Sequence, residues 1–353
     1  MTNLRIAIAG FGLAGEVFHA PLIAATEGLT VRAVATSNPV RAARARSQYP
    51  GVVVVADADA LLADADSIDA LVVATPNRLH VPIARAALHR GLPVVVDKPV
   101  APDGAAAKAL VDDFAAAGVP LTVFQNRRWD GDFLTVRRAV ESGLLGEVTR
   151  FESRYERFRP DIRDGGWREL PGAAEGGGLL LDLGSHLVDQ ALVLFGPVRR
   201  VYAELDCRRP GSQVDDDVFV ALEHAGGVRS HLWMSTLAPV GGRSLRASGT
   251  NGGIETPGLD PQEDQLAAGL RPRDLGWGQG RPARLVDRAG EERSMTPQPG
   301  AYERYYAAVR DALHGDAAMP VDPRDSVAAL HVIDAARRSA ASATVIDTAG
   351  DRR

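Results

Sequence analysis

Residues 4–15 read LRIAIAGFGLAG, a mostly apolar run that predicts a strand, followed by a G-x-G-x-x-G pattern that opens an amphipathic stretch. In such a turn Gly10 permits the tight bend, Gly12 lets a pyrophosphate approach the backbone, and Gly15 lets helix and strand pack closely. The amide groups at the helix start favour an anion. A glycine turn without a ligand is the alternative, but the flanking strand and helix favour a bound dinucleotide. The residues expected to contact its phosphates are Gly10, Phe11, Gly12, Leu13, Ala14 and Gly15.

The alternation of strand and helix continues through residues 1–125. Short runs rich in β-branched residues alternate with alanine-rich stretches such as 81–90, whose apolar spacing of three and four is typical of a helix. This order indicates a parallel sheet covered on both faces, as in a doubly wound α/β Rossmann domain. The expected strands are 4–9, 29–35, 52–56, 70–74, 93–96 and 121–124.

A second domain is expected over residues 126–353. A helix over 179–195 follows a glycine run, and strands over 198–205, 217–223, 228–236 and 243–249 are separated by turn residues. Strands without helices between them predict an antiparallel sheet, so this domain belongs to the α+β class. Proline and glycine predict irregular chain over 256–300, and helical patterns return at 302–313 and 323–340.

Composition excludes several classes of protein. A chain of 353 residues favours two domains, and 45% hydrophobic with 24% charged residues is ordinary for a globular protein. A net charge of -5 gives no support for a nucleic-acid partner. We expect a cytoplasmic chain because neither a leader nor an apolar run of membrane-spanning length is visible. Cys207 is the only cysteine, which excludes an intrachain disulfide and a thiolate-rich metal site.

The end of the second expected strand bears on the choice between NAD and NADP. NAD sites usually place a carboxylate there to hold the ribose hydroxyls, but this chain has Ser37 and Asn38, followed by Arg41. A hydroxyl and a guanidinium suit the 2′-phosphate of NADP, which is therefore preferred, with NAD possible. A compatible alternative is that Ser37 or Asn38 simply caps a helix while Arg41 is solvated.

Polar residues also follow two later strands, at the sheet edge where ligands of open α/β sheets bind. We expect Lys98 to face the cofactor, oriented by or paired with Asp97, although a solvated loop lysine is the alternative. Asp182 and His186 lie four residues apart, which places them on one face of a helix. His186 is a candidate proton acceptor or donor, whereas spacing alone favours a structural histidine with a capping aspartate. The other residues expected at the cofactor are Thr75, Pro76, Asn77, His80, Asp97 and Gln125.

The glycine turn, Asp97-Lys98-Pro99 and Asp182-x-x-x-His186, in this order, resemble the Gfo/Idh/MocA family of oxidoreductases nearly end to end. Longer stretches at 10–23, 124–130 and 178–186 resemble the subgroup with NADP-dependent scyllo-inositol dehydrogenases. The family's usual Glu-Lys-Pro is Asp-Lys-Pro here, which keeps the lysine.

This resemblance implies a Rossmann domain joined to a domain with a large, mainly antiparallel sheet, often used to form homodimers or homotetramers. It also implies hydride transfer that interconverts a secondary alcohol and a ketone (or aldehyde) of a polyol, inositol or sugar-like substrate, without a metal. Lys98 would bond the reacting oxygen, His186 would exchange its proton, and Asp182 would assist. Two other functions stay open: a sugar-modifying enzyme that retains its cofactor, and a non-enzymatic NADP sensor. Further substrate contacts are expected from Asn126, Arg128, Trp167 and Arg168.

Overall fold

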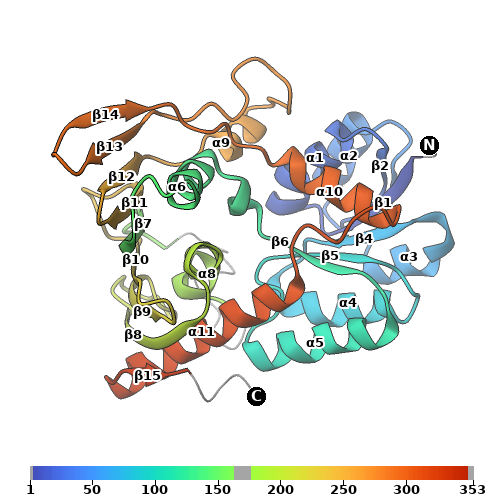
Figure 1. Cartoon of the computed structure of the whole chain (residues 1–353). Coiled ribbons are helices and arrows are strands. Elements are labelled where there is room, and N and C mark those ends of the chain that lie inside the picture. The colour runs from blue at the N-terminus through green and yellow to red at the C-terminus, as the bar shows by residue number, and fades with distance from the viewer. Residues whose placement is uncertain (1–2, 163–175, 349–353) are drawn as a thin grey trace.

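The computed structural model describes residues 3–162 and 176–348 and consists of two sheets with helices packed around them (Figure 1). Trp167 and Arg168, two of the expected substrate contacts, lie outside the described residues. None of the helices in the described ranges combines the length and apolar character needed to cross a bilayer.

The first sheet is parallel, in the order β3-β2-β1-β4-β5-β6, which confirms the predicted Rossmann domain. Its two faces bury different sets of side chains, because successive residues of a strand point to opposite sides. In β1, Ala7 and Ala9 face one core, while Ile6 and Ile8 face the other. The strands are β1 (Leu4–Ala9), β2 (Leu29–Ala35), β3 (Val53–Val55), β4 (Ala70–Val73), β5 (Val94–Asp97) and β6 (Leu121–Phe124).

Three of the helices around this sheet, α2, α3 and α5, begin at polar capping residues. Asn38 accepts hydrogen bonds from the amides of Val40 and Arg41 at 3.0 and 3.1 Å, so the expected cap of the second helix is confirmed. Asp57 and Asp103 cap two others in the same way. These helices are η1 (Ala14–His19), α1 (Ala20–Ala25), α2 (Pro39–Gln48), α3 (Ala58–Ala63), α4 (His80–Leu88) and α5 (Gly104–Ala117), with short turns at Ala65–Ser67 and Asn77–Leu79.

The second sheet has the order β14-β13-β12-β11-β7-β10-β9-β8-β15. It is mostly antiparallel, as expected, except that β7 and β10 run parallel. One face packs on helices; in β9 the buried residues on it are Val218, Val220 and Leu222. The strands are β7 (Val148–Glu156), β8 (Val198–Asp206), β9 (Asp217–His224), β10 (Arg229–Ser235), β11 (Arg243–Gly249), β12 (Gly252–Pro257), β13 (Ala283–Asp287), β14 (Glu292–Met295) and β15 (Ile346–Asp347).

Two predictions about this half were wrong. The range 256–300 is not irregular throughout, because it contains the end of β12, helix α9 and the hairpin of β13 and β14. The expected single helix over 179–195 is divided at Leu183. The carbonyl of Asp182 would accept from the amide of His186 in a continuous helix, but here it accepts from Lys98, and that amide donates to Leu183 instead.

The C-terminal helices hold the two halves together. α10 packs on α1, and α11 packs on α5 as well as on α8 and β8 (Figure 1). An aspartate of α11, Asp334, also accepts from the first amide of α5, that of Gly104, at 2.8 Å. The helices of this half are α6 (Gly131–Glu141), α7 (Leu179–Asp182), α8 (Gly184–Phe195), α9 (Gln262–Ala267), α10 (Glu303–Leu313) and α11 (Pro323–Ser342), with a short turn at Asn126–Trp129.

His19 lies in the aromatic core between α10 and the first sheet and gives the fold a predictable acid sensitivity. Its ring packs on Phe124 with centroids 4.3 Å apart, and its Nδ1 is hydrogen-bonded to the Tyr306 hydroxyl. Burial lowers the pKa of His19 from 6.5 to about 4, so the native ring stays neutral where the unfolded one is protonated. The free energy of unfolding should therefore fall by ~3 kcal/mol as the pH drops from 6.5 to 4.

Urea unfolding at several pH values measures this dependence, with His19→Gln as the comparison. The free energy of unfolding of the wild type minus that of the variant should shrink steadily as the pH falls from 6.5 to 4. A difference that does not change with pH would contradict the account.

Candidate active site

The glycine turn after β1 has the geometry that a dinucleotide requires. Gly10 adopts a φ of 98°, and a Cβ there would lie 2.5 Å from the carbonyl oxygen of Ala74. A Cβ on Gly15 would lie 2.1 Å from the carbonyl oxygen of Gly10, so only glycine permits this close packing. A Cβ on Gly12, in contrast, would have Nη1 of Arg41 as its nearest neighbour outside the adjacent chain, at 3.8 Å. The turn therefore leaves open space at the position where a pyrophosphate would approach the backbone.

Two polar side chains that follow β4 and β6, at the same sheet edge as the glycine turn, contain buried atoms without a partner among the described residues. The Thr75 hydroxyl and the Gln125 side-chain carbonyl are buried and make no hydrogen bond within the described chain. Buried polar atoms are normally paired, so both atoms retain hydrogen-bonding capacity for a ligand. Asn77 and His80 instead have structural contacts, because Asn77 donates to Gly176 and the two ring nitrogens of His80 contact carbonyls of Pro99 and Thr75.

The expected 2′-phosphate residues lie together at the end of β2. Ser37 and Asn38 are exposed, and Arg41 lies in the first turn of α2. Nη1 of Arg41 lies 3.8 Å from the position that a Cβ on Gly12 would take, so its guanidinium lies beside the glycine turn.

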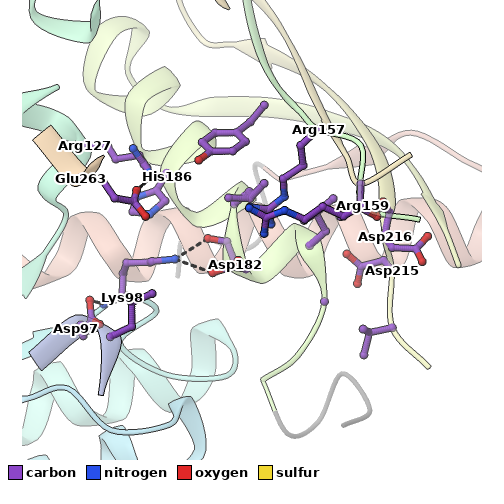
Figure 2. Close-up of a pocket in the computed structure, with 18 of the residues that line it drawn as sticks. Asp97, Lys98, Arg127, Arg157, Arg159, Asp182, His186, Asp215, Asp216 and Glu263 are labelled. Atoms are coloured by element: carbon purple, nitrogen blue, oxygen red, sulfur yellow. Dashed lines mark hydrogen bonds and ion pairs between the residues drawn. The ribbon is translucent and has the colours of Figure 1, made fainter. Parts of the chain in front are cut away.

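A cavity of about 370 Å³ opens between the two sheets beside the glycine turn. Leu13 and Ala14 after the glycine turn and Asp97 and Lys98 at the end of β5 line it from the first half. The second half supplies the opposite wall (Figure 2). Its volume is in the range of small-molecule sites. The residues that line it from the second half include Asn126, Arg127, Tyr155, Arg157, Arg159, Asp182, His186, Arg209, Asp215, Asp216 and Glu263.

Lys98 and Asp182 form the central ion pair of this cavity (Figure 2). The Lys98 ammonium donates to the backbone carbonyl of Asp182 at 2.7 Å and to its carboxylate at 2.9 Å. An ammonium has three donors, so one N–H is left for a bound oxygen. Asp97 does not pair with the ammonium; its carboxylate accepts from the backbone amide of Lys98. Asp97 therefore orders the turn, and Asp182 orients the lysine.

His186 is buried, lies in the first turn of α8 and lines the same cavity. Because the helix breaks at Leu183, Asp182 and His186 lie on successive short helices rather than on one face of a single helix. Both nevertheless reach the cavity, where Lys98 joins them from β5. The structure thus brings together the three residues expected to carry the chemistry.

The adjacent arginines after β6 have separate roles. Arg127 lines the cavity, whereas Arg128 is absent from its wall and forms a bidentate pair with Asp189, with a further contact to Asp325. The expected substrate contact of Arg128 thus receives no support, because its guanidinium is occupied by structural carboxylates. Burial alone would lower the pKa of Arg127, but Asp130 holds it well above its usual value, so the charge persists.

Several lining residues were missed by the sequence analysis. Tyr155 and Arg157 come from the end of β7, and Arg209, Asp215 and Asp216 come from the β8–β9 connection. The alternation of apolar and charged residues over 148–156 could have indicated β7. No local pattern indicates that its last residues reach the cavity.

Comparison with known proteins identifies the family. Residues 4–125 match the model of the oxidoreductase family with an NAD-binding Rossmann fold, and residues 133–255 match the GFO/IDH/MocA C-terminal domain. The chain belongs to the Gfo/Idh/MocA family. It is thus an oxidoreductase with an NAD-binding Rossmann fold, as the resemblance predicted.

Relatives of this Gfo/Idh/MocA protein match it over nearly its whole length. It is 39% identical to the oxidoreductase YdgJ of Escherichia coli, over 96% of each chain. It is 31% identical to scyllo-inositol 2-dehydrogenase (NADP(+)) of Bacillus subtilis, over 96% of this chain and 94% of that one. A crystal structure of an oxidoreductase from Klebsiella pneumoniae superimposes with a TM-score of 0.88 at 37% identity, over 98% of this chain and 95% of that one.

Proposed function

We propose that this protein is an NADP-dependent dehydrogenase that interconverts a secondary alcohol and a ketone on a polyol, inositol or sugar-like substrate. The observation that carries the proposal is the Lys98–Asp182 ion pair, which shares one cavity with His186 beside the glycine turn. The similarity to a scyllo-inositol 2-dehydrogenase (NADP(+)) supports both the substrate class and the cofactor.

In this proposal the chain's residues manage the proton and the charge of the reacting oxygen. The nicotinamide cofactor, when bound, would accept the hydride as NADP and supply it as NADPH. His186 takes the hydroxyl proton during oxidation and returns it during reduction. The remaining N–H of Lys98 stabilises the negative charge that develops on the substrate oxygen, and Asp182 holds the ammonium in place.

The cofactor would be held by the residues around the glycine turn. Gly10, Phe11, Gly12, Leu13, Ala14 and Gly15 would face the pyrophosphate, and Thr75 and Gln125 would supply their unpaired polar atoms. Ser37 and Arg41 would bind the 2′-phosphate. Asn126 would contact the substrate from the opposite wall.

Arg41→Ala should weaken NADP binding while leaving NAD binding nearly unchanged. Only NADP carries the 2′-phosphate, and the loss of a charge-assisted contact of this kind should raise the NADP dissociation constant about tenfold to a hundredfold. Fluorescence titration with both cofactors measures this, and Arg46→Ala, near the end of the same helix, is the matched control. An equal effect on NAD and NADP would refute the assignment of Arg41.

The whole function is tested by following nicotinamide absorbance with inositols, aldoses and sugar acids, with NADP and NAD in parallel. We expect reduction of NADP by at least one of these alcohols and a clear preference for NADP. Absence of cofactor reduction across the panel would refute the dehydrogenase, and a preference for NAD would refute the cofactor.

A further inference from the structure

Arg157 follows the last residue of β7, and its side chain reaches into the cavity (Figure 2). The backbone there is fixed, because the amide of Arg157 donates to the carbonyl of Ser235 at 2.9 Å and its carbonyl accepts from Ala238. The side chain therefore starts from a rigid strand end. It enters from a different wall than Lys98, which follows β5.

The guanidinium of Arg157 has no carboxylate partner among residues 3–162 and 176–348. Its side-chain contact is with the ring of Tyr155, whose centroid lies 5.8 Å from the guanidinium carbon. Its Nε is buried and makes no hydrogen bond to any described residue. Other cations of the cavity do have partners: Lys98 pairs with Asp182, Arg127 with Asp130 and Glu263, and Arg209 with Asp216.

Two carboxylates of the same cavity, those of Asp215 and Asp216, accept hydrogen bonds from groups other than Arg157. Asp216 accepts from the side chain of Arg209 and from two backbone amides. Asp215 accepts from the amide of Leu180 at 2.6 Å. Burial raises the pKa of Asp215, and that backbone hydrogen bond opposes the rise. These acids are therefore held by the β8–β9 connection and by α7, not by Arg157.

A half-buried guanidinium without an anion is unfavourable, since charged groups removed from water are normally paired. Arginine binds carboxylates through two parallel hydrogen bonds, which gives both affinity and orientation. We propose that Arg157 binds a carboxylate of the substrate, so that this dehydrogenase acts on an acidic polyol or sugar. This inference rests on the proposed function, because it assigns the substrate to the cavity that holds Lys98 and His186.

The arrangement also fixes which part of the substrate is recognised. Lys98 and His186 would hold the carbinol carbon, whereas Arg157 reaches the cavity from the other sheet. The carboxylate is therefore a recognition group separate from the reacting carbon. Its loss should weaken binding more than it slows the chemistry of bound substrate.

Calorimetry with protein saturated with NADPH tests the carboxylate separately from catalysis, because the reduced cofactor cannot oxidise an added alcohol. The probes are glucuronate and glucose, which differ at one carbon by a carboxylate. We expect the wild type to bind glucuronate about tenfold to a hundredfold more tightly than glucose. Arg157→Gln should remove this preference and leave glucose binding unchanged.

Two further variants control for folding and for general charge. Arg157→Lys retains a cation and should keep part of the preference, and thermal unfolding of each variant checks that it folds. Arg208→Gln removes an exposed arginine outside the cavity wall and should behave as the wild type.

Equal binding of the two sugars by the wild type, or a preference that survives Arg157→Gln, would overturn the proposal. Tighter binding of a hexose phosphate than of glucuronate would overturn the choice of a carboxylate. Hydride transfer to NADP from either sugar is measured separately. A carboxylate preference without any hydride transfer would support Arg157 and count against the dehydrogenase.

Discussion

Lys98→Met should lower kcat about a thousandfold while leaving the dissociation constant of NADP within a few-fold of the wild type. In the proposed mechanism the ammonium supplies the donor that stabilises charge on the substrate oxygen, and removing one such donor typically lowers the rate by two to three orders of magnitude. Methionine keeps much of the length and volume of the side chain, so the cavity wall should persist. Stopped-flow kinetics and fluorescence titration with NADP measure the two quantities.

Lys108→Met is the matched control, because Lys108 pairs with Asp112 on the exposed face of α5, away from the cavity. That variant should retain wild-type kcat. A Lys98→Met enzyme with kcat within a few-fold of the wild type would refute the role of the lysine.

Gly12→Val should raise the dissociation constants of NADP and NAD by about a hundredfold or more, so that binding is no longer measurable. The melting temperature should not change. Apart from the adjacent chain, a Cβ at Gly12 would meet no atom closer than 3.8 Å, so we expect the fold to tolerate a side chain there. The same side chain would fill the space through which the pyrophosphate approaches the backbone. Thermal unfolding and cofactor titration separate the two effects.

Gly280→Val is the control here, since a Cβ on Gly280 meets nothing within 4 Å and the residue lies far from the turn in the sequence. It should keep both stability and cofactor affinity. Gly15→Val should instead unfold the chain, because a Cβ at Gly15 collides with the carbonyl of Gly10. Normal NADP affinity in Gly12→Val would show that the cofactor does not use this turn.

The first sheet was predictable because its signals are local. The central strands β1, β4, β5 and β6 are largely buried on both faces and read as short apolar runs. The helices between the strands have their own apolar spacing, and α2, α3 and α5 also have polar caps. The observed strands differ from the predicted ones by at most a residue or so at either end; β5, for example, ends at Asp97 rather than at residue 96. Asp97 and Lys98 at the end of β5 accordingly line the cavity beside the glycine turn.

The second sheet was less predictable because pairing, rather than composition, holds its outer strands. β13 and β14 form a short, largely exposed hairpin at the sheet edge, with little apolar character to distinguish it from loop. β7 alternates charged and apolar residues and sits in the middle of the sheet, where it pairs with β10 and β11. The sequence does not reveal those distant partners.

The site, too, depends in part on distant contacts that the sequence does not reveal. Lys98, Asp182 and His186 sit in recognisable motifs, so their convergence could be expected. Which of Arg127 and Arg128 faces the cavity depends on Asp189 and Asp325, which lie far along the chain and hold the second arginine. Arg157 and Arg209 reach the cavity only because the long sheet brings the ends of β7 and β8 beside it.

The most direct test of the dehydrogenase is the fate of the hydrogen on the carbinol carbon. The protein is supplied with NADP and either an inositol or a hexuronate deuterated at its carbinol carbons, and the reduced cofactor is recovered and analysed by mass spectrometry. The proposed function predicts NADPH that has gained one deuterium, released in proportion to the ketone formed. Product formed without deuterium in released cofactor, or no product from either alcohol, would contradict it.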